Sequence, residues 1–495
     1  MLTLSRAEYR DKVYACWLGK NIGGTLGMPY EGRKFVNDLT FYDPVPKKAA
    51  ANDDLDLQLV WLKLLEERGT DPPLPDFADY WMKYLSAYPW NEYGFCMRNL
   101  ARGLRPPISG CFENYFVDEM GSPIRSEIWA CVAPGDPQLA AAMAWKDSAL
   151  DHAGGEGMYG EIFWAAVESA AFVVRDPLTL IRIGLAMIPI PCQISRVIRE
   201  ALWCHANGLR WAAARERIAA RFGHLQPCNA VPNHGFIILG WLYGRDFGDR
   251  LCRAVNCGYD TDCTGGTLGA VLGIIGGTRG IPAKWRRPIG SEIVLHKLTG
   301  QFNAPRTIEE LTWRTVAVGE RVLRERSDSA RIGERTSRPP EYLTYLLRNG
   351  RVREALGQDV HSAVAVAGDL EITFHYNGEP VLRPGEGRFV RVSAVRKPGP
   401  SCAERVSAGA RVIAPKGWRV DAVAGEPQTF CLRAGKKVAD HNEVTVTIDG
   451  RSASFVFLGP GEAKGFPAGD NVPCCSCGCG ARQEACLRRR RARGR

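Results

Sequence analysis

Two stretches of the sequence carry a glycine at every fourth position, at Gly19, Gly23 and Gly27 and at Gly265, Gly269, Gly273 and Gly277. Residues four apart lie on one face of an α-helix, so each stretch predicts a helix with one face almost free of side chains. Glycine inside a helix costs about 1 kcal/mol relative to alanine. The repetition therefore indicates a role in close packing or in substrate access.

The two glycine faces could pack against each other. In an antiparallel arrangement the end of the first helix, at Glu31, would lie beside the start of the second helix, at Asp260 and Asp262. The alternative is that each face packs against a large side chain of some other element. The spacing of the glycines allows both arrangements.

The first two thirds of the chain are predicted to be helical. Apolar residues recur there at spacings of three and four, as in LDLQLVWLKLLEERG and GEIFWAAVESAAFVV. A capping-box spacing of Thr307 and Glu310 marks the start of the last long helix. We expect an all-helical catalytic domain over residues 1–326, followed by a polar, proline-bearing linker over 327–345.

The pattern changes beyond this linker to short runs that alternate between apolar and polar residues, such as NEVTVTIDG and RSASFVFLGP. The Asp-Gly pair between these two runs is a hairpin turn signal. Residues 346–462 are therefore predicted to form a small all-β sandwich as an accessory domain. A chain of 495 residues exceeds the size of a single hydrophobic core, which also favours more than one domain.

Residues 463–495 form a tail rich in cysteine and arginine, which we expect to be disordered. Its CCSCGC run has a poor spacing for tetrahedral zinc and no paired second cluster. Seven arginines and one glutamate in residues 481–495 supply +6 of the net charge of +10. Because the rest of the chain is only mildly basic, we expect neither a nucleic-acid nor a membrane partner.

The remaining composition fits a globular protein of the cytoplasm. The other twelve cysteines are spread between residues 16 and 431, without the regular spacing of a secreted disulfide scaffold, and are expected to be reduced. No apolar run approaches the roughly 20 residues that cross a bilayer, and the first residues carry no export signal. A cytoplasmic location follows as the expectation.

Two aspartate pairs are candidate metal ligands. Asp53 and Asp54 begin an amphipathic helix, where acidic residues are also common simply as caps. Asp260 and Asp262 lie between glycines, and a cation would relieve their mutual repulsion, although Asp-x-Asp also occurs in ordinary turns. His152, flanked by glycines, either faces a cavity or is a structural residue.

In their order and spacing, GKNIGGTLGMPYEG, NDD, MGSPIRSEIW, DHAGGEG, VPN and GYDTDCTGGTLGAVLG resemble the ADP-ribosylglycohydrolase family. The resemblance spans the whole helical part. It implies an all-helical fold that holds two Mg²⁺ or Mn²⁺ ions and hydrolyses the glycosidic bond of an ADP-ribosyl group. Oxygen ligands of this kind suit these hard cations, and such ions can orient a sugar diol and activate water.

The resemblance also implies roles for individual residues. The catalytic residues would be Glu31, Asp53 and Asp262. The metal ligands would be Asn52, Asp53, Asp54, Asp260, Asp262 and Cys263. The substrate-binding residues would be Glu31, Gly121, Ser122, His152, Gly154, Gly155, Glu156, Gly157 and Tyr159.

The sequence departs from the family pattern at two of these positions. Asn52 stands where the family usually has threonine, and its carbonyl oxygen could replace the hydroxyl as a ligand. Cys263 also stands in place of a threonine, and its soft sulfur either leaves the metal to water or yields the role to Thr264. The affinity for the metal, or the choice of metal, is therefore open.

The substrate is open as well. Residues 81–129 are unusually aromatic, and aromatic rings stack on adenine, stack on sugars or simply fill a core. The expected partner is a small-molecule or glycosyl substrate. Our first hypothesis is an ADP-ribosyl or related ribosyl substrate, the second a carbohydrate such as a pentofuranoside, and the third a non-catalytic binding protein of the same fold. The sequence gives no prediction of the oligomeric state.

Overall fold

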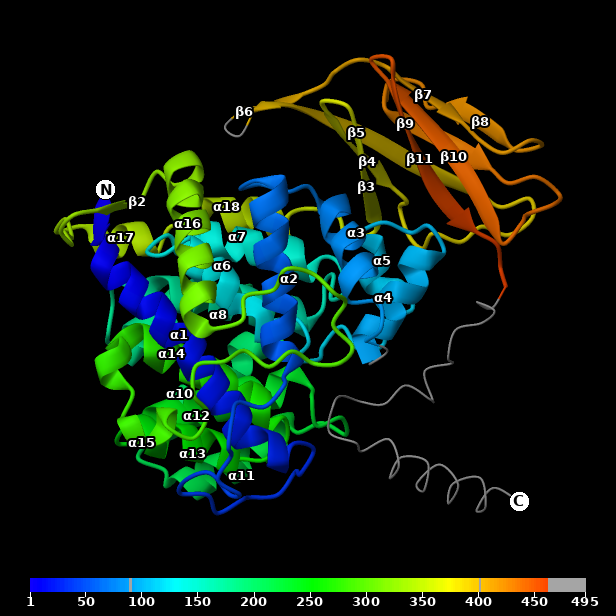
Figure 1. Cartoon of the computed structure of the whole chain (residues 1–495). Coiled ribbons are helices and arrows are strands. Elements are labelled where there is room, and N and C mark those ends of the chain that lie inside the picture. The colour runs from blue at the N-terminus through cyan, green and yellow to red at the C-terminus, as the bar shows by residue number, and fades with distance from the viewer. Residues whose placement is uncertain (89–90, 400–401, 462–495) are drawn as a thin grey trace, which may run out of the picture.

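The computed structural model describes residues 1–88, 91–399 and 402–461. The predicted cysteine- and arginine-rich tail lies outside these residues. A helical body occupies the N-terminal two thirds of the chain, and a β-rich region follows it (Figure 1). The predicted fold class, an all-α domain followed by a small all-β domain, is confirmed.

The helical body is built from segments of very different length. The α-helices are α1 Arg6–Gly27, α2 Asp53–Arg68, α3 Leu74–Tyr84, α4 Asn91–Ala101, α5 Ile108–Cys111, α6 Ser126–Val132, α7 Pro137–Ser148, α8 Glu156–Ala171, α9 Pro177–Leu185, α10 Gln193–Ala206, α11 Trp211–Phe222, α12 Ala230–Tyr243, α13 Phe247–Asn256, α14 Thr261–Gly276, α15 Ala283–Arg286, α16 Ile308–Arg326, α17 Tyr342–Leu346 and α18 Gly350–Leu356. Short 3-10 turns are η1 Met28–Tyr30, η2 Pro123–Arg125 and η3 Thr278–Gly280.

The glycine faces of α1 and α14 pack directly against each other, as the first of the two arrangements predicts (Figure 1). A Cβ atom on Gly23 would lie 1.8 Å from the carbonyl oxygen of Gly265, and one on Gly19 would lie 2.0 Å from that of Gly269. The register runs in opposite directions along the two helices. The C-terminal end of α1 therefore lies beside the N-terminal end of α14.

The segment predicted to be a linker contains regular structure. Strand β2, Ala330–Gly333, pairs in parallel with β1, Leu2–Ser5, and α17 follows it. These strands are too short for an alternating pattern to reveal them. The β-rich region begins with β3 at Ser362, later than residue 346, because α18 still packs on the helical body against α7.

The β-rich region consists of two antiparallel sheets packed face to face. One sheet has the strand order β3-β4-β5-β9-β8, with β6 paired to β5, and the other has the order β11-β10-β7. Their strands are β3 Ser362–Ala367, β4 Leu370–His375, β5 Gly387–Gly399, β6 Cys402–Arg405, β7 Ala410–Ile413, β8 Arg419–Ala422, β9 Thr429–Arg433, β10 His441–Ile448 and β11 Arg451–Leu458. Phe374 of one sheet stacks on Phe455 of the other, with ring centroids 5.1 Å apart.

Part of the aromatic stretch 81–129 joins the two regions. Leu104, Ile108 and Phe112 belong to the same apolar core as the β-sheets. The backbone N–H of Val364 donates to the carbonyl oxygen of Pro106 at 3.0 Å. The β-rich region therefore packs against the segment that connects α4 to η2. Figure 1 shows this contact near α4 and α5.

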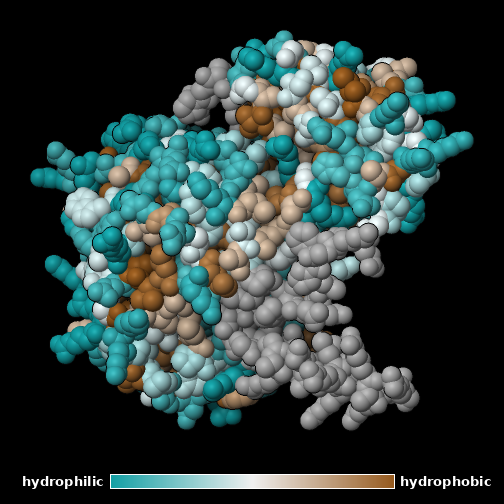
Figure 2. All heavy atoms as spheres, turned by 45° about the vertical axis from the view of Figure 1, so that its right-hand side comes forward, coloured by the Kyte–Doolittle hydropathy of each residue, from teal (hydrophilic) through white to brown (hydrophobic). Residues whose placement is uncertain are grey.

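The outer surface is mixed in character. The face in Figure 2 is mainly hydrophilic, with separate hydrophobic patches between the hydrophilic side chains. Among the described residues, no helix is both long and apolar enough to cross a membrane. The cysteines whose side chains are described are all free thiols.

Candidate metal centre

The ends of three helices meet at an acidic cavity. Glu31 follows η1 at the end of α1, Asp53 begins α2, and Asp260 caps α14. The α1–α14 packing brings the first and the last of these together. The cavity is lined by Glu31, Asp53, Asn91, Glu92, Tyr93, Met120, Gly121, Ile124, Cys228, Asp260, Asp262 and Cys263.

Two groups of side chains at this cavity could each hold a cation. In one group, ligand atoms of Glu31, Cys228 and Asp260 lie within 4.8 Å of one another. In the other, the same holds for Asp54, Asp262 and Cys263. Each group combines carboxylate oxygens with one thiol, a set that accepts Mn²⁺ or a softer cation more readily than an all-oxygen site does.

The carboxylates of the cavity repel one another. Burial, with the charges of Asp54 and Asp262, raises the pKa of Asp53 well above its ordinary value. The pKa of Asp260 is also raised well above its ordinary value, by burial and by the charges of Asp262 and Glu31, and that of Asp262 rises to about 7. One oxygen each of Asp260 and Asp262 is buried without a hydrogen-bond donor. A cation would satisfy both the charge and these oxygens.

Asn52 and Lys20 contact the second ligand group, which is Asp54, Asp262 and Cys263. The Asn52 side-chain oxygen Oδ1 accepts the backbone N–H of Asp54 at 2.8 Å as a helix cap, and the side-chain nitrogen Nδ2 donates to Asp262 Oδ2 at 3.3 Å. The expected ligand atom of Asn52 is thus occupied by the cap, and its role as a metal ligand stays a prediction. Buried Lys20 Nζ lies 3.2 Å from Asp54 Oδ2 and 2.9 Å from Glu127 Oε1.

A buried charge network supports the opposite wall. Arg125 binds Asp147 at 2.8 Å and Asp151 at 2.6 Å, and Asp151 lies 2.9 Å from His152 Nδ1. Although burial alone would lower the pKa of His152, the carboxylates of Asp151 and Glu92 raise it to about 9. His152 Nε2 lies 3.6 Å from Glu92 Oε1, and Glu92 lines the cavity while His152 lies buried behind it.

Glycine at position 121 makes room for Glu92. A Cβ atom on Gly121 would lie 1.9 Å from Glu92 Oε1, and the Gly121 carbonyl oxygen accepts a hydrogen bond from Arg125 Nη1 at 2.8 Å. Gly121 therefore lines the cavity as expected. Ser122 is buried behind it and donates to Glu161.

The remaining expected substrate-binding residues lie around the start of α8. They are Gly154, Gly155, Glu156, Gly157 and Tyr159, and none of them is among the residues that line the acidic cavity. Their role toward a substrate stays a prediction.

The helical part of the chain matches a known protein family. Residues 5–316 match the family model of the ADP-ribosylglycohydrolases. The chain belongs to the ADP-ribosylglycohydrolase family. No curated protein matches the chain. A solved ADP-ribosylglycohydrolase-related protein complex is similar at 18% identity, covering 64% of this chain and 99% of that one with a TM-score of 0.44.

Three site residues of this family member were not predicted from the sequence. Glu92 lies within the aromatic stretch 81–129, Cys228 lies three residues before the start of the VPN motif, and Lys20 lies between two glycines of α1. The VPN motif itself acts through Asn233, whose side-chain oxygen accepts the backbone N–H of Asp260 at 3.2 Å. A lysine on an otherwise bare helix face is the one signal that could have been used.

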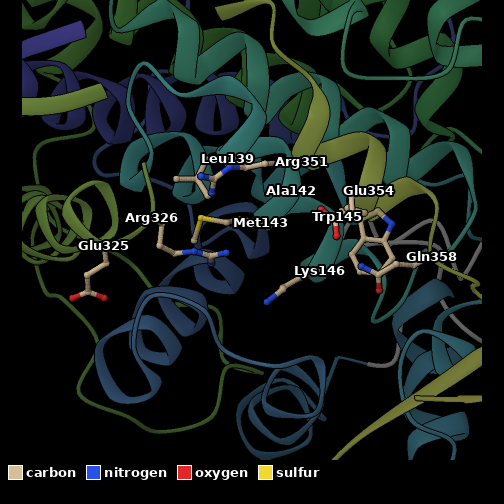
Figure 3. A pocket seen from close by; sticks show the side chains of 11 residues that line it. Leu139, Ala142, Met143, Trp145, Lys146, Glu325, Arg326, Arg351, Glu354 and Gln358 are labelled. Atoms are coloured by element: carbon tan, nitrogen blue, oxygen red, sulfur yellow. The ribbon is translucent and has the colours of Figure 1, made fainter. Parts of the chain in front are cut away.

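A larger hollow of about 430 Å³ lies elsewhere on the helical body, between α7, α16 and α18 (Figure 3). It is lined by both cations and carboxylates, and two of the cations are already paired with a residue outside the hollow. Lys146 and Arg326 both bind Asp71, at 2.5 and 2.6 Å. Because it has no cluster of carboxylates like that of the acidic cavity, we do not place the candidate metal centre there.

The stability of the metal-free protein is expected to fall between about pH 4 and about pH 7. The pKa of Asp262 is about 7 in the folded state against 3.8 as its ordinary value, so the folded state binds more protons in this window. Rising pH therefore favours unfolding, whereas a cation that replaces these protons binds better at high pH. Melting curves with chelator and with Mn²⁺ across this range should diverge as pH rises; a constant difference would contradict the prediction.

Proposed function

We propose that this chain is a metal-dependent hydrolase of a glycosidic bond, with two Mg²⁺ or Mn²⁺ ions at the acidic cavity. The observation that carries the proposal is the pair of ligand groups at the ends of α1, α2 and α14, with buried carboxylate oxygens that lack donors. Membership of the ADP-ribosylglycohydrolase family supports the bond type.

The residues present fit such ions. Asp54, Asp260 and Asp262 would hold them, with Glu31 and Asp53 at the open side of the cavity. When bound, the ions would supply Lewis-acid stabilisation of sugar oxygens and activation of water. Glycosidic cleavage also needs groups that carry a proton to and from the reacting atoms. Glu31, Asp53 and Asp262 are the carboxylates that we propose for this role.

The cysteines bear on the choice of ion. Cys263 Sγ lies 3.5 Å from Asp54 Oδ1, within hydrogen-bond reach, and burial with the nearby carboxylates raises the pKa of this thiol well above its ordinary value. A neutral thiol is a weak ligand for Mg²⁺. We propose that Cys263 leaves its coordination position to water and that Mn²⁺ binds more tightly than Mg²⁺.

Addition of Mn²⁺ is expected to raise the melting temperature of the wild type, and Asp262→Ala to remove most of that rise. One ion at 100 times its dissociation constant stabilises the folded state by about 2.7 kcal/mol. Differential scanning fluorimetry with Mn²⁺, Mg²⁺ and chelator measures the effect. Asp38→Ala, which removes an exposed carboxylate, is the matched control and should keep the full rise. An equal rise in the Asp262→Ala variant would rule out the proposed centre.

A further inference from the structure

The larger sheet of the β-rich region carries a hollow of about 550 Å³ that shares no lining residue with the acidic cavity. Pockets that bury a small molecule are typically about 300 to 1,000 Å³, so the size suits one or two sugar rings or a molecule of similar bulk. We call it the outer-sheet hollow. Its lining consists of Asp359, His375, Asn377, Phe389, Val390, Arg391, Val423, Glu426 and Thr429.

Three neighbouring strands place polar side chains in one row across this hollow (Figure 1). His375 of β4 pairs with Arg391 of β5, and Arg391 pairs with Thr429 of β9. Side chains alternate between the two faces of a strand. The residues next to the row belong to the buried core between the two sheets, as Phe374, Val392 and Phe430 do. The row therefore projects from the opposite, outer face.

The histidine of this row is held by its neighbours. His375 Nδ1 lies 3.1 Å from Asp359 Oδ2, and its Nε2 lies 3.2 Å from Ser393 Oγ. Burial lowers the pKa of His375, so the ring is neutral at neutral pH. The floor of the hollow is thus fixed by hydrogen bonds within the protein.

The other polar side chains of the hollow are open to a ligand. Within the part of the chain that the structure describes, no hydrogen bond or ion pair engages the side chains of Asn377, Glu426 or Thr429. Arg391 has one long contact, 3.5 Å from Nη2 to His375 Nδ1. A guanidinium only donates and a carboxylate only accepts, whereas an amide does both. Together they match hydroxyl groups, which also donate and accept.

An aromatic ring borders these polar groups. Phe389 lies two residues before Arg391 on β5, so the two side chains share the outer face. Its side chain is 55% exposed. An exposed phenylalanine alone is ordinary. Beside a row of open donors and acceptors, its ring offers the apolar surface on which the C–H face of a sugar ring packs while the hydroxyl groups reach the polar side chains.

The charges of the hollow favour a neutral ligand. The carboxylates of Asp359 and Glu426 face one guanidinium, that of Arg391, and His375 is neutral. An anionic ligand would meet the two carboxylates, and a cationic ligand would meet the guanidinium. Among the described side chains no group suited to hold a metal ion occurs here, so no cation would reverse this balance.

We propose that the outer-sheet hollow binds a neutral saccharide, with a sugar ring on Phe389 and its hydroxyl groups bonded to Asn377, Arg391 and Glu426. This second site does not depend on the proposed metal centre. It gives the β-rich region the role of a glycan-recognition module.

The hollow is held in place on the helical body. Val360 follows Asp359, and its carbonyl oxygen accepts a hydrogen bond from Cys111 Sγ at 3.6 Å. A Cβ atom on Gly154, in the DHAGGEG motif, would lie 3.5 Å from the side chain of Val360. A saccharide in the hollow would therefore be held at a fixed position relative to the helical body.

Saturation-transfer difference NMR on the full chain with chelator tests the proposal, because chelator keeps metal-bound sugar out of the acidic cavity. The neutral probes are the methyl glycosides of glucose, galactose, mannose, xylose and arabinose and the disaccharides cellobiose, maltose and lactose. We expect at least one to bind with a dissociation constant of about 10 mM or below. Glucuronate, galacturonate and glucosamine should bind more weakly than the best neutral probe, by about threefold or more.

Phe389→Ala should weaken binding of the best neutral probe about tenfold, because the apolar surface under the sugar is lost. Phe35→Ala makes the same change at a phenylalanine of the helical part that is 61% exposed, and should leave the affinity unchanged. Glu426→Ala, which removes an exposed carboxylate, should weaken binding about threefold. Melting curves of the variants check that the fold is intact.

Three results would each overturn the saccharide site. They are failure of the whole neutral panel to bind the wild type, binding that Phe389→Ala leaves unchanged, and a charged sugar that binds as tightly as the best neutral probe. The Mn²⁺-induced thermal shift reports separately on the metal centre, so the two proposals stand or fall independently.

Discussion

Replacement of Gly23 by alanine is expected to destabilise the helical body by about 3 kcal/mol or more. The new Cβ atom would lie 1.8 Å from the carbonyl oxygen and 2.2 Å from the carbonyl carbon of Gly265. Both atoms belong to the backbone of α14, so no side chain can turn away to relieve the overlap. The two helices would have to separate, which would also move Glu31 away from Asp260.

Gly276→Ala is the matched control for this substitution. Gly276 lies in the last turn of α14, and a Cβ atom there would meet nothing within 4 Å. Since alanine favours a helix over glycine by about 1 kcal/mol, this variant should be as stable as the wild type or slightly more so. Denaturant unfolding of both variants measures the difference, and the Mn²⁺-induced thermal shift shows whether the site survives. Equal stability of the two variants would refute the role of the glycine face.

The α1–α14 pairing could be predicted from sequence because glycine spacing encodes it directly. A residue without a side chain at every fourth position has one strong physical use, which is contact between backbones. The aspartate pairs follow from the same pattern, since they lie at the ends of the helices that the glycines bring together. The position of the aspartate pairs could therefore be predicted without knowing the conformation of any loop.

Glu92 and Cys228 could not be predicted in this way. Cys228 reaches the cavity from an irregular segment whose backbone bonds to residues 118–120, and Glu92 reaches it from the first turn of α4. The start of α8 gives a second example. Its GGEG run fits the family pattern, but the N–H of Glu156 is bound by the carboxylate of Asp118, which lies in a separate segment 38 residues earlier. Such contacts between irregular segments carry no periodic signal.

Arg125→Met is expected to cost about 3 to 5 kcal/mol of folding free energy. Arg125 is fully buried, and its guanidinium binds Asp147, both oxygens of Asp151 and the carbonyl oxygen of Gly121. Methionine has a similar volume but no charge, so Asp147 and Asp151 would remain as buried carboxylates without their cation. That state is much less favourable than either the intact network or a fully apolar core.

Loss of the guanidinium should act on the cavity as well as on stability. The charge of Arg125 helps to lower the pKa of Asp151 to about 2, and the Asp151 carboxylate in turn keeps His152 protonated beside Glu92. In Arg125→Met we expect raised pKa values of both Asp151 and His152, because each group loses a neighbouring cation, and NMR titration of the histidine ring would detect the change. Arg245→Met, which removes a guanidinium that binds Asp249 at the surface, is the control and should change little. The double variant Arg125→Met/Asp151→Asn should recover part of the lost stability, because it removes one of the two uncompensated charges. Full stability of Arg125→Met alone would show that the network does not hold this wall of the site.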